Sequence, residues 1–279
     1  MKKLLLSGIT AVALMAAGNA QAGVGLDLYG GTGVARTPLA MSNAPMEFAI
    51  AAEYVFSDDL FIPTRAAIGL PYGIELGGAY WFINPDMGNV DVKIPMYDLT
   101  AKWVLPKFVN NLGLAVGAHY SGMEIKIDAL NYTVKNPGYD FYGVATYIVP
   151  LGGSGLALIP SGGVWYQGRN LKIEADGVDE TRSGVKFFGS LLLKGANWAV
   201  GGEYMTADDG PDGVDTVPFA KPGTTSVDGF YWVGGRFFVN PMITLQAGYI
   251  NNADILDDGG DLSKGVFHAG VQFAFGGGK

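Results

Sequence analysis

The sequence predicts a single transmembrane antiparallel β-barrel of about twelve strands, with ten or fourteen as the alternatives. Apolar residues recur at every second position along most of residues 45–275, as they do in strands that have one apolar face. The mean hydropathy is +0.22, yet residues 23–279 contain no apolar run near the ~18 residues that a membrane helix needs. Short turns also alternate with longer polar connections. This combination is typical of membrane barrels.

Residues 1–22 are expected to be a cleaved signal peptide. Lys2 and Lys3 precede the apolar stretch 4–17, and Ala20-Gln21-Ala22 forms a small-residue cleavage site. Removal of this segment would shift the formal net charge from −8 to −10 by the loss of the two lysines. The rest divides into an N-terminal segment (23–44), the barrel (45–275) and a short tail (276–279).

The composition excludes several classes of function. The chain has no cysteine, so disulfides, thiolate chemistry, cysteine metal sites and a lipid-modified N-terminal cysteine are excluded. The chain is acidic, with a formal net charge of −8, whereas nucleic-acid-binding proteins carry basic stripes. We therefore expect no nucleic-acid partner. The Gly-rich stretch 30–33 does not open a helix and is therefore no phosphate-binding loop. We expect no cofactor and no metal site.

Residues 23–44 leave two alternatives open. The segment is rich in glycine and irregular, and it ends where Arg36, Thr37 and Pro38 lead toward the first regular strand. It is either a periplasmic lead-in or a segment folded into the mouth of the barrel. Residues 26–35 could add strands, which would change the strand number.

From Met46 onward the alternation is regular. In residues 74–82, for example, Ile74, Leu76 and Tyr80 share one face, and Glu75 and Ala79 share the other. The twelve predicted strands are 46–56, 65–70, 74–82, 95–105, 112–121, 139–149, 156–167, 184–194, 197–206, 227–239, 243–250 and 264–275. Their usual length of about nine to eleven residues matches a tilted membrane crossing.

The connections favour a barrel over a soluble sandwich. One set is short and rich in Gly, Pro and Asn, as tight turns require: 70–73, 106–111, 150–155, 194–197 and 239–242. The other set is mostly longer and polar: 57–63, 84–94, 122–138, 168–182, 207–226 and 251–263. Short turns on one rim and long loops on the other are the layout of outer-membrane barrels, and both termini then lie on the short-turn side.

The last strand carries a family resemblance. Gly270 is followed by the alternate aromatics Phe273 and Phe275, and this ending resembles the closing signal of bacterial outer-membrane β-barrel proteins, although here residues 276–279 follow it. The resemblance implies recognition by the barrel-assembly machinery through these three residues. Residues 37–40 and 72–77 are also similar to barrel proteins linked to exopolysaccharide export. Those proteins are commonly lipoproteins, whereas this chain has no cysteine to carry a lipid. We therefore take no function from that similarity.

The face opposite the apolar one is expected to line the lumen. It carries more acids than bases, two histidines and many small residues. The charged and histidine positions are Glu47, Glu53, Arg65, Glu75, Asp98, Lys102, His119, Asp140, Lys186, Glu203, Asp228, Arg236 and His268. Such a lumen is either a narrow aqueous path or is closed by paired charges and loops.

One pattern suggests an enzyme. His119 and Ser121 share a strand face, and outer-membrane phospholipases carry a similar His-x-Ser element in a twelve-strand barrel. The pair lies on the lumen face, however, whereas a lipid hydrolase needs its catalytic groups at the outer surface. We therefore expect no catalytic residues. The acidic clusters in the long loops match no calcium-loop spacing.

The sequence thus favours a porin-like channel for small polar solutes or ions with a mild cation preference, located in the outer membrane. The alternative is a non-conducting structural or interaction barrel that displays acidic extracellular loops. Outer-membrane lipid and lipopolysaccharide are the expected partners.

Overall fold

A computed structural model describes residues 26, 33–34, 38–56, 60–84, 94–106, 109–127, 132–152, 155–173, 178–206, 230–251 and 266–276. The predicted signal peptide, most of residues 23–44, the tail residues 277–279 and Asp228 lie outside these ranges. Among the described residues, no helix has the length and apolar character needed to cross a bilayer.

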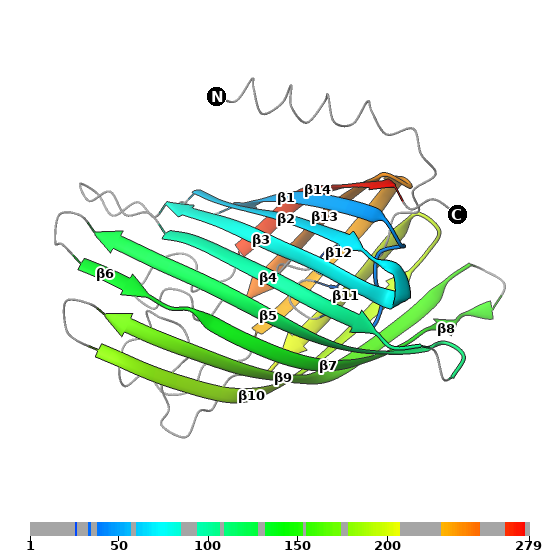
Figure 1. Ribbon diagram of the computed structural model, residues 1–279. Coiled ribbons are helices and arrows are strands. Elements are labelled where there is room, and N and C mark those ends of the chain that lie inside the picture. Colours follow the sequence, from blue (N-terminus) through cyan, green and yellow to red (C-terminus); the bar gives the residue numbers. More distant parts are fainter. Residues whose placement is uncertain are drawn as a thin grey trace.

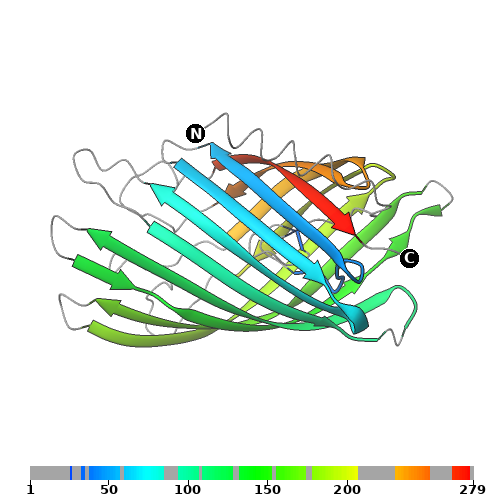
Figure 2. The same ribbon diagram turned by 45° about the horizontal axis from the view of Figure 1, so that its top comes forward.

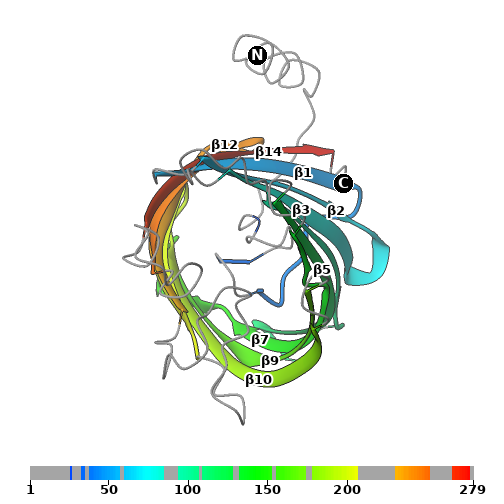
Figure 3. The ribbon, with the colours of Figure 1, turned by 90° about the vertical axis from the view of Figure 1, so that its left-hand side faces the viewer.

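Twelve strands close into one antiparallel ring, as the alternation predicts (Figures 1 and 3). The strands of the ring are β1 (Glu47–Phe56), β2 (Leu60–Gly69), β3 (Ile74–Asn84), β4 (Ile94–Val104), β5 (Leu112–Ile127), β7 (Gly138–Tyr147), β9 (Ala157–Ile173), β10 (Val178–Lys194), β11 (Trp198–Met205), β12 (Phe230–Asn240), β13 (Ile243–Asn251) and β14 (Val266–Gly276). Two short strands, β6 (Tyr132–Lys135) and β8 (Val149–Pro150), pair with β9 beyond either end of β7. A 3-10 turn, Pro71–Gly73, joins β2 to β3.

The first and last strands join the two edges of the sheet. β1 pairs with β14 from Glu47↔Gly276 to Phe56↔Phe267, and Figure 2 shows the red β14 beside the blue β1. This pairing leaves the sheet without an open edge, which a lipid environment requires because it offers no partner for unpaired backbone groups.

The barrel has an apolar exterior and a polar interior. Outward side chains such as Phe141, Phe187 and Phe267 are 54%, 60% and 65% exposed, whereas the inward Glu47 and Arg65 are each 1% exposed. Soluble proteins rarely bury charged groups while exposing so many large apolar ones. This distribution is that of a transmembrane barrel with a lipid-facing wall.

Three predicted connections are shorter than the sequence suggested. β2 begins at Leu60, so the first connection is 57–59 and not 57–63. Pro63 fits within β2 because it pairs with Trp81 of β3, while the pairing of β2 with β1 stops at Thr64. A proline is tolerated where a strand has no neighbour on one side.

The predicted loops 122–138 and 168–182 are also largely strand. β5 runs on to Ile127, and β9 and β10 remain paired out to Ile173 and Val178. The exposed ends of this hairpin carry an ion pair between Lys172 and Asp179 at 3.2 Å. Polar and charged residues such as Lys172 and Asp179 interrupt the apolar alternation here, so a pattern based on alternation misses this hairpin end.

Gly270 of the closing strand is needed for packing against β1. A Cβ at this position would lie 2.6 Å from the carbonyl oxygen of Ala52 and closer still to Cγ of Glu53. Gly143 on the outer wall is a contrasting case, because a Cβ there would meet nothing within 4 Å.

We therefore expect Gly270→Ala to lower the free energy of unfolding by about 1–3 kcal/mol, the usual range for overpacking. Gly143→Ala, which adds the same methyl group in open space, should change it much less. Urea titration of the refolded barrel, followed by the loss of heat-modifiable gel mobility, measures both. Equal stability of the two variants would contradict the packing role of Gly270.

Candidate functional site

The inward face carries a dense set of charged side chains. Eleven of the thirteen predicted positions are at most 6% exposed: Glu47, Glu53, Arg65, Glu75, Asp98, Lys102, His119, Asp140, Glu203, Arg236 and His268. Lys186 is half-buried on β10, and Asp228 lies outside the described residues. The period of two in each strand is what places these groups on the inner wall.

Strand register brings several of these charges together. Glu75 and Lys102 stand opposite each other on β3 and β4, with Oε1 of Glu75 2.7 Å from Nζ of Lys102. His119 and Asp140 are likewise opposite on β5 and β7, with Nδ1 of His119 3.6 Å from Oδ2 of Asp140. These pairs reduce the cost of burying charge.

Glu53 has two partners on different strands. It forms an ion pair with Arg65 of β2, and its Oε2 lies 3.2 Å from Nδ1 of His268 on β14. The Nε1–H of Trp232 donates to Nε2 of His268 at 2.7 Å, which leaves the hydrogen of that imidazole on Nδ1, toward Glu53. A polar chain therefore links strands β12, β14, β1 and β2 across the inner wall.

Residues of the N-terminal segment lie inside the ring, as Figure 3 shows for its blue parts. Arg236 holds this segment through its guanidinium group. Its Nη1 donates to the carbonyl of Gly33 at 2.8 Å, and its Nη2 donates to the carbonyls of Leu26, at 3.3 Å, and Val34. Arg65 Nη1 also donates to the carbonyl of Leu26 at 3.2 Å.

Backbone N–H groups of the same segment reach other parts of the wall. The N–H of Leu26 donates to Gln272 at 3.0 Å. The N–H of Ala40 donates to Oγ1 of Thr146 at 2.9 Å, and those of Asn43 and Ala44 donate to the carboxylates of Glu75 and Glu47 at 2.8 and 2.9 Å. The segment is thus tied to both the cations and the anions of the lumen.

Apolar contacts complete this attachment. Leu26 packs in one cluster with the alanines Ala49, Ala51, Ala67 and Ala274 of β1, β2 and β14. Gly113 is also close to the segment, since a Cβ there would lie 2.5 Å from the carbonyl oxygen of Ala40. The small residues of the inner wall therefore make room for the segment itself.

Aromatic residues form a second inward feature, and the sequence reasoning gave them no role. Trp165, Tyr142 and Phe188 pack in one cluster with Ala40 of the segment. Trp81 and Trp232 belong to a second cluster, which contains Val34 and Leu39 of the segment. The signal was present in their parity: Trp165 lies between the outward Val164 and Tyr166, so it must point inward.

The His119-Tyr120-Ser121 element lies in this aromatic region. The ring of His119 contacts Tyr142 at 6.2 Å and Trp165 at 5.2 Å between centroids, both edge to face. Asp140 lies beside this histidine, with 3.6 Å between its Oδ2 and Nδ1 of His119, which is longer than a hydrogen bond. The histidine also lies inside the barrel at 5% exposure, away from the surface where a lipid hydrolase meets its substrate. No three His, Asp or Glu side chains in the described part of the chain form a candidate metal site.

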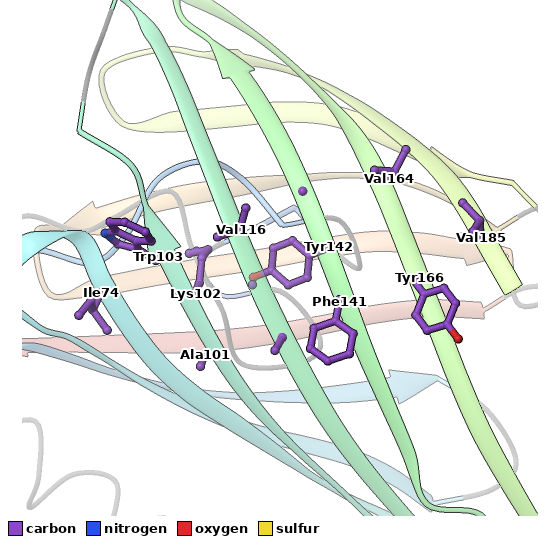
Figure 4. A pocket seen from close by; sticks show the side chains of 13 residues that line it. Ile74, Ala101, Lys102, Trp103, Val116, Phe141, Tyr142, Val164, Tyr166 and Val185 are labelled. Atoms are coloured by element: carbon purple, nitrogen blue, oxygen red, sulfur yellow. The ribbon is translucent and has the colours of Figure 1, made fainter. Parts of the chain in front are cut away.

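The outer wall carries a groove of about 820 Å³ across β3 to β10 (Figure 4). Most of its lining faces outward and runs from Ile74 of β3 through Phe141 of β7 to Val185 of β10. This face contacts lipid in a membrane, so the groove belongs to the wall and not to the lumen.

No family model and no curated protein matches this chain. Solved structures with a similar fold include the KdgM porin, at 14% identity, covering 82% of this chain and 99% of that one with a TM-score of 0.47. The NanC porin shares 11% identity over 81% and 98%, with a TM-score of 0.49. The Omp33 outer-membrane protein of Acinetobacter baumannii shares 12% over 83% and 97%, with a TM-score of 0.40.

The Glu75–Lys102 pair gives a test of the charge arrangement. Lys102→Met should lower the free energy of unfolding by about 3–5 kcal/mol, because it leaves a buried carboxylate without its cation. Lys102→Met combined with Glu75→Gln should recover most of this loss, since the amide oxygen can still accept the N–H of Asn43. Urea titration measures both variants. Equal losses would show that the two groups are not coupled.

Proposed function

We propose that the protein is an outer-membrane channel for small solutes whose lumen is closed at rest by its N-terminal segment. The observation that carries this proposal is the set of three carbonyl groups, from Leu26, Gly33 and Val34, held by Arg236 in the barrel interior. A barrel with only a structural role has no evident need for a segment of its own chain across its lumen.

The attachment suits a closure that can be released. Arg65 and Arg236 bind one part of the segment, and Thr146, Glu75 and Glu47 bind another. Hydrogen bonds to charged groups contribute about 1.5–3 kcal/mol each, and water and solute can replace them when the segment moves. The described residues of the segment, 26, 33–34 and 38–44, therefore belong to the barrier, and the surrounding ring stays intact during opening.

When open, the lumen is expected to pass small polar solutes and ions with a mild preference for cations. Of the predicted lumenal positions that the structure describes, six are the acids Glu47, Glu53, Glu75, Asp98, Asp140 and Glu203, and four are the bases Arg65, Lys102, Lys186 and Arg236. An acidic pore concentrates cations. The preference is modest because Arg65 and Lys102 are paired with two of the acids.

The second candidate is a non-conducting barrel that presents its long acidic loops outside the cell. The paired charges of the inner wall favour it, because ion pairs inside a membrane barrel also occur as purely structural networks. The two functions differ in one respect: only a channel begins to conduct when the segment is loosened.

Arg236→Ala should raise conductance, because it removes the donor that holds three carbonyls of the segment. Lys194→Ala is the matched control, since it also removes one positive charge but from a side chain that lies over Phe238, 5.4 Å from the ring centroid. Planar bilayer recording of the folded proteins should show larger or more frequent steps for Arg236→Ala alone. A heat-modifiable, silent Arg236→Ala barrel would favour the non-conducting function.

Ion preference gives a separate test. In the Arg236→Ala background, reversal potentials across a salt gradient should indicate cation selectivity. Adding Glu47→Gln should reduce it, because Glu47 is a buried acid that forms no ion pair in the described part of the chain. An anion-selective reversal potential, or one unchanged by Glu47→Gln, would contradict the proposed role of the lumenal acids.

A further inference from the structure

Part of the lumen is more apolar than a water-filled barrel requires. Val55, Trp81, Trp232 and Ile250 are 2%, 8%, 2% and 7% exposed and belong to one buried cluster. All four lie within four residues of a long-loop end of β1, β3, β12 or β13. The interiors of water-filled barrels are polar, so this apolar set on the long-loop side calls for another explanation.

The tip of the N-terminal segment occupies this apolar region. Gly33 and Pro38 form an antiparallel bridge, and each is followed by a buried apolar residue. These residues, Val34 and Leu39, are 1% and 0% exposed and belong to the same cluster. Met41, Met96 and Phe230 pack against it. We call the wall residues of this cluster, Val55, Trp81, Trp232 and Ile250, the apolar seat.

The two indoles of the seat have their polar atoms engaged. Trp81 Nε1–H donates to Oδ2 of Asp98 at 2.9 Å, and Trp232 Nε1–H donates to Nε2 of His268 at 2.7 Å. The two tryptophans therefore offer ring surface and no spare N–H donor. A polar molecule entering the seat would lose hydrogen bonds to water without replacing them there, which is costly.

We infer that the apolar seat binds small apolar or aromatic solutes, and that such a solute excludes the side chains of Val34 and Leu39 from it. This inference rests on the proposed function, because it names the solute class that releases the closing segment. A solute that fills the seat gains the contacts now made by Val34 and Leu39. The segment then loses its apolar attachment and keeps only its polar ones, so binding shifts the population toward the open state.

The absence of cysteine permits a direct test with single thiols. Leu39→Cys places a thiol in the seat, where a water-soluble maleimide reaches it only when the segment leaves. Benzene is the apolar probe, and glycerol is a polar solute of similar size. Tyr72→Cys, at a turn residue that is 90% exposed, controls for direct effects of benzene on the labelling reaction. Val34→Cys serves if Leu39→Cys fails to fold.

In proteoliposomes, benzene should raise the labelling rate of the Leu39→Cys protein by about tenfold or more, with no change for glycerol or for Tyr72→Cys. If benzene has no effect while Arg236→Ala still conducts, the apolar seat is not a solute site but the channel proposal stands. If benzene and glycerol raise the labelling rate equally, the apolar seat does not select apolar solutes and the inference is wrong. If benzene exposes the thiol while Arg236→Ala is silent, the seat binds solutes and the channel proposal fails.

Discussion

The pairing of β1 with β14 is the interaction on which the rest of the structure depends. In lipid the backbone polar groups of a sheet must all find partners within it, so only a closed ring is stable. Closure fixes which face of each strand points inward. It places Phe141 and Phe267 against lipid, and it forces Glu53, Arg65 and Glu75 into a confined interior, where charged groups need partners.

Those partners have a second role in this protein. Arg65 neutralises Glu53 and also holds the carbonyl of Leu26. Glu75 neutralises Lys102 with one oxygen and accepts the N–H of Asn43 with the other. The network that stabilises the charges of the wall is thus the same network that binds the N-terminal segment. Movement of the segment therefore changes the contacts of these ion pairs, and loss of an ion pair weakens the attachment of the segment.

The sequence allowed the ring to be predicted because a lipid-facing wall needs apolar residues at every second position of its twelve strands. It did not reveal the ends of β9 and β10, where charged residues such as Lys172 and Asp179 interrupt that pattern. The contacts of the segment were also beyond local patterns, since Leu26 and Gln272 are 246 positions apart. Ala49, Ala67 and Gly113 are small lumenal residues, but only the fold shows that Leu26 and Ala40 of the segment pack against them. Their parity places Trp81 and Trp232 on the inward face. Only the fold shows that they pack in one cluster with Val34 and Leu39 of the segment.

We propose that the N-terminal segment controls passage through the lumen in which its described residues lie. A cysteine at residue 113 would place its Cβ 3.3 Å from that of Ala40, close to the ~3.5–4.5 Å of disulfides, and a small shift of the segment relieves the close approach to the Ala40 carbonyl. The most direct measurement is bilayer conductance of Ala40→Cys/Gly113→Cys in the Arg236→Ala background, before and after reduction. The account predicts a single intramolecular disulfide, low conductance while it is oxidised, and a return to the Arg236→Ala level on reduction. Free thiols in the folded barrel, or a conductance that does not change when the disulfide is reduced, would contradict it.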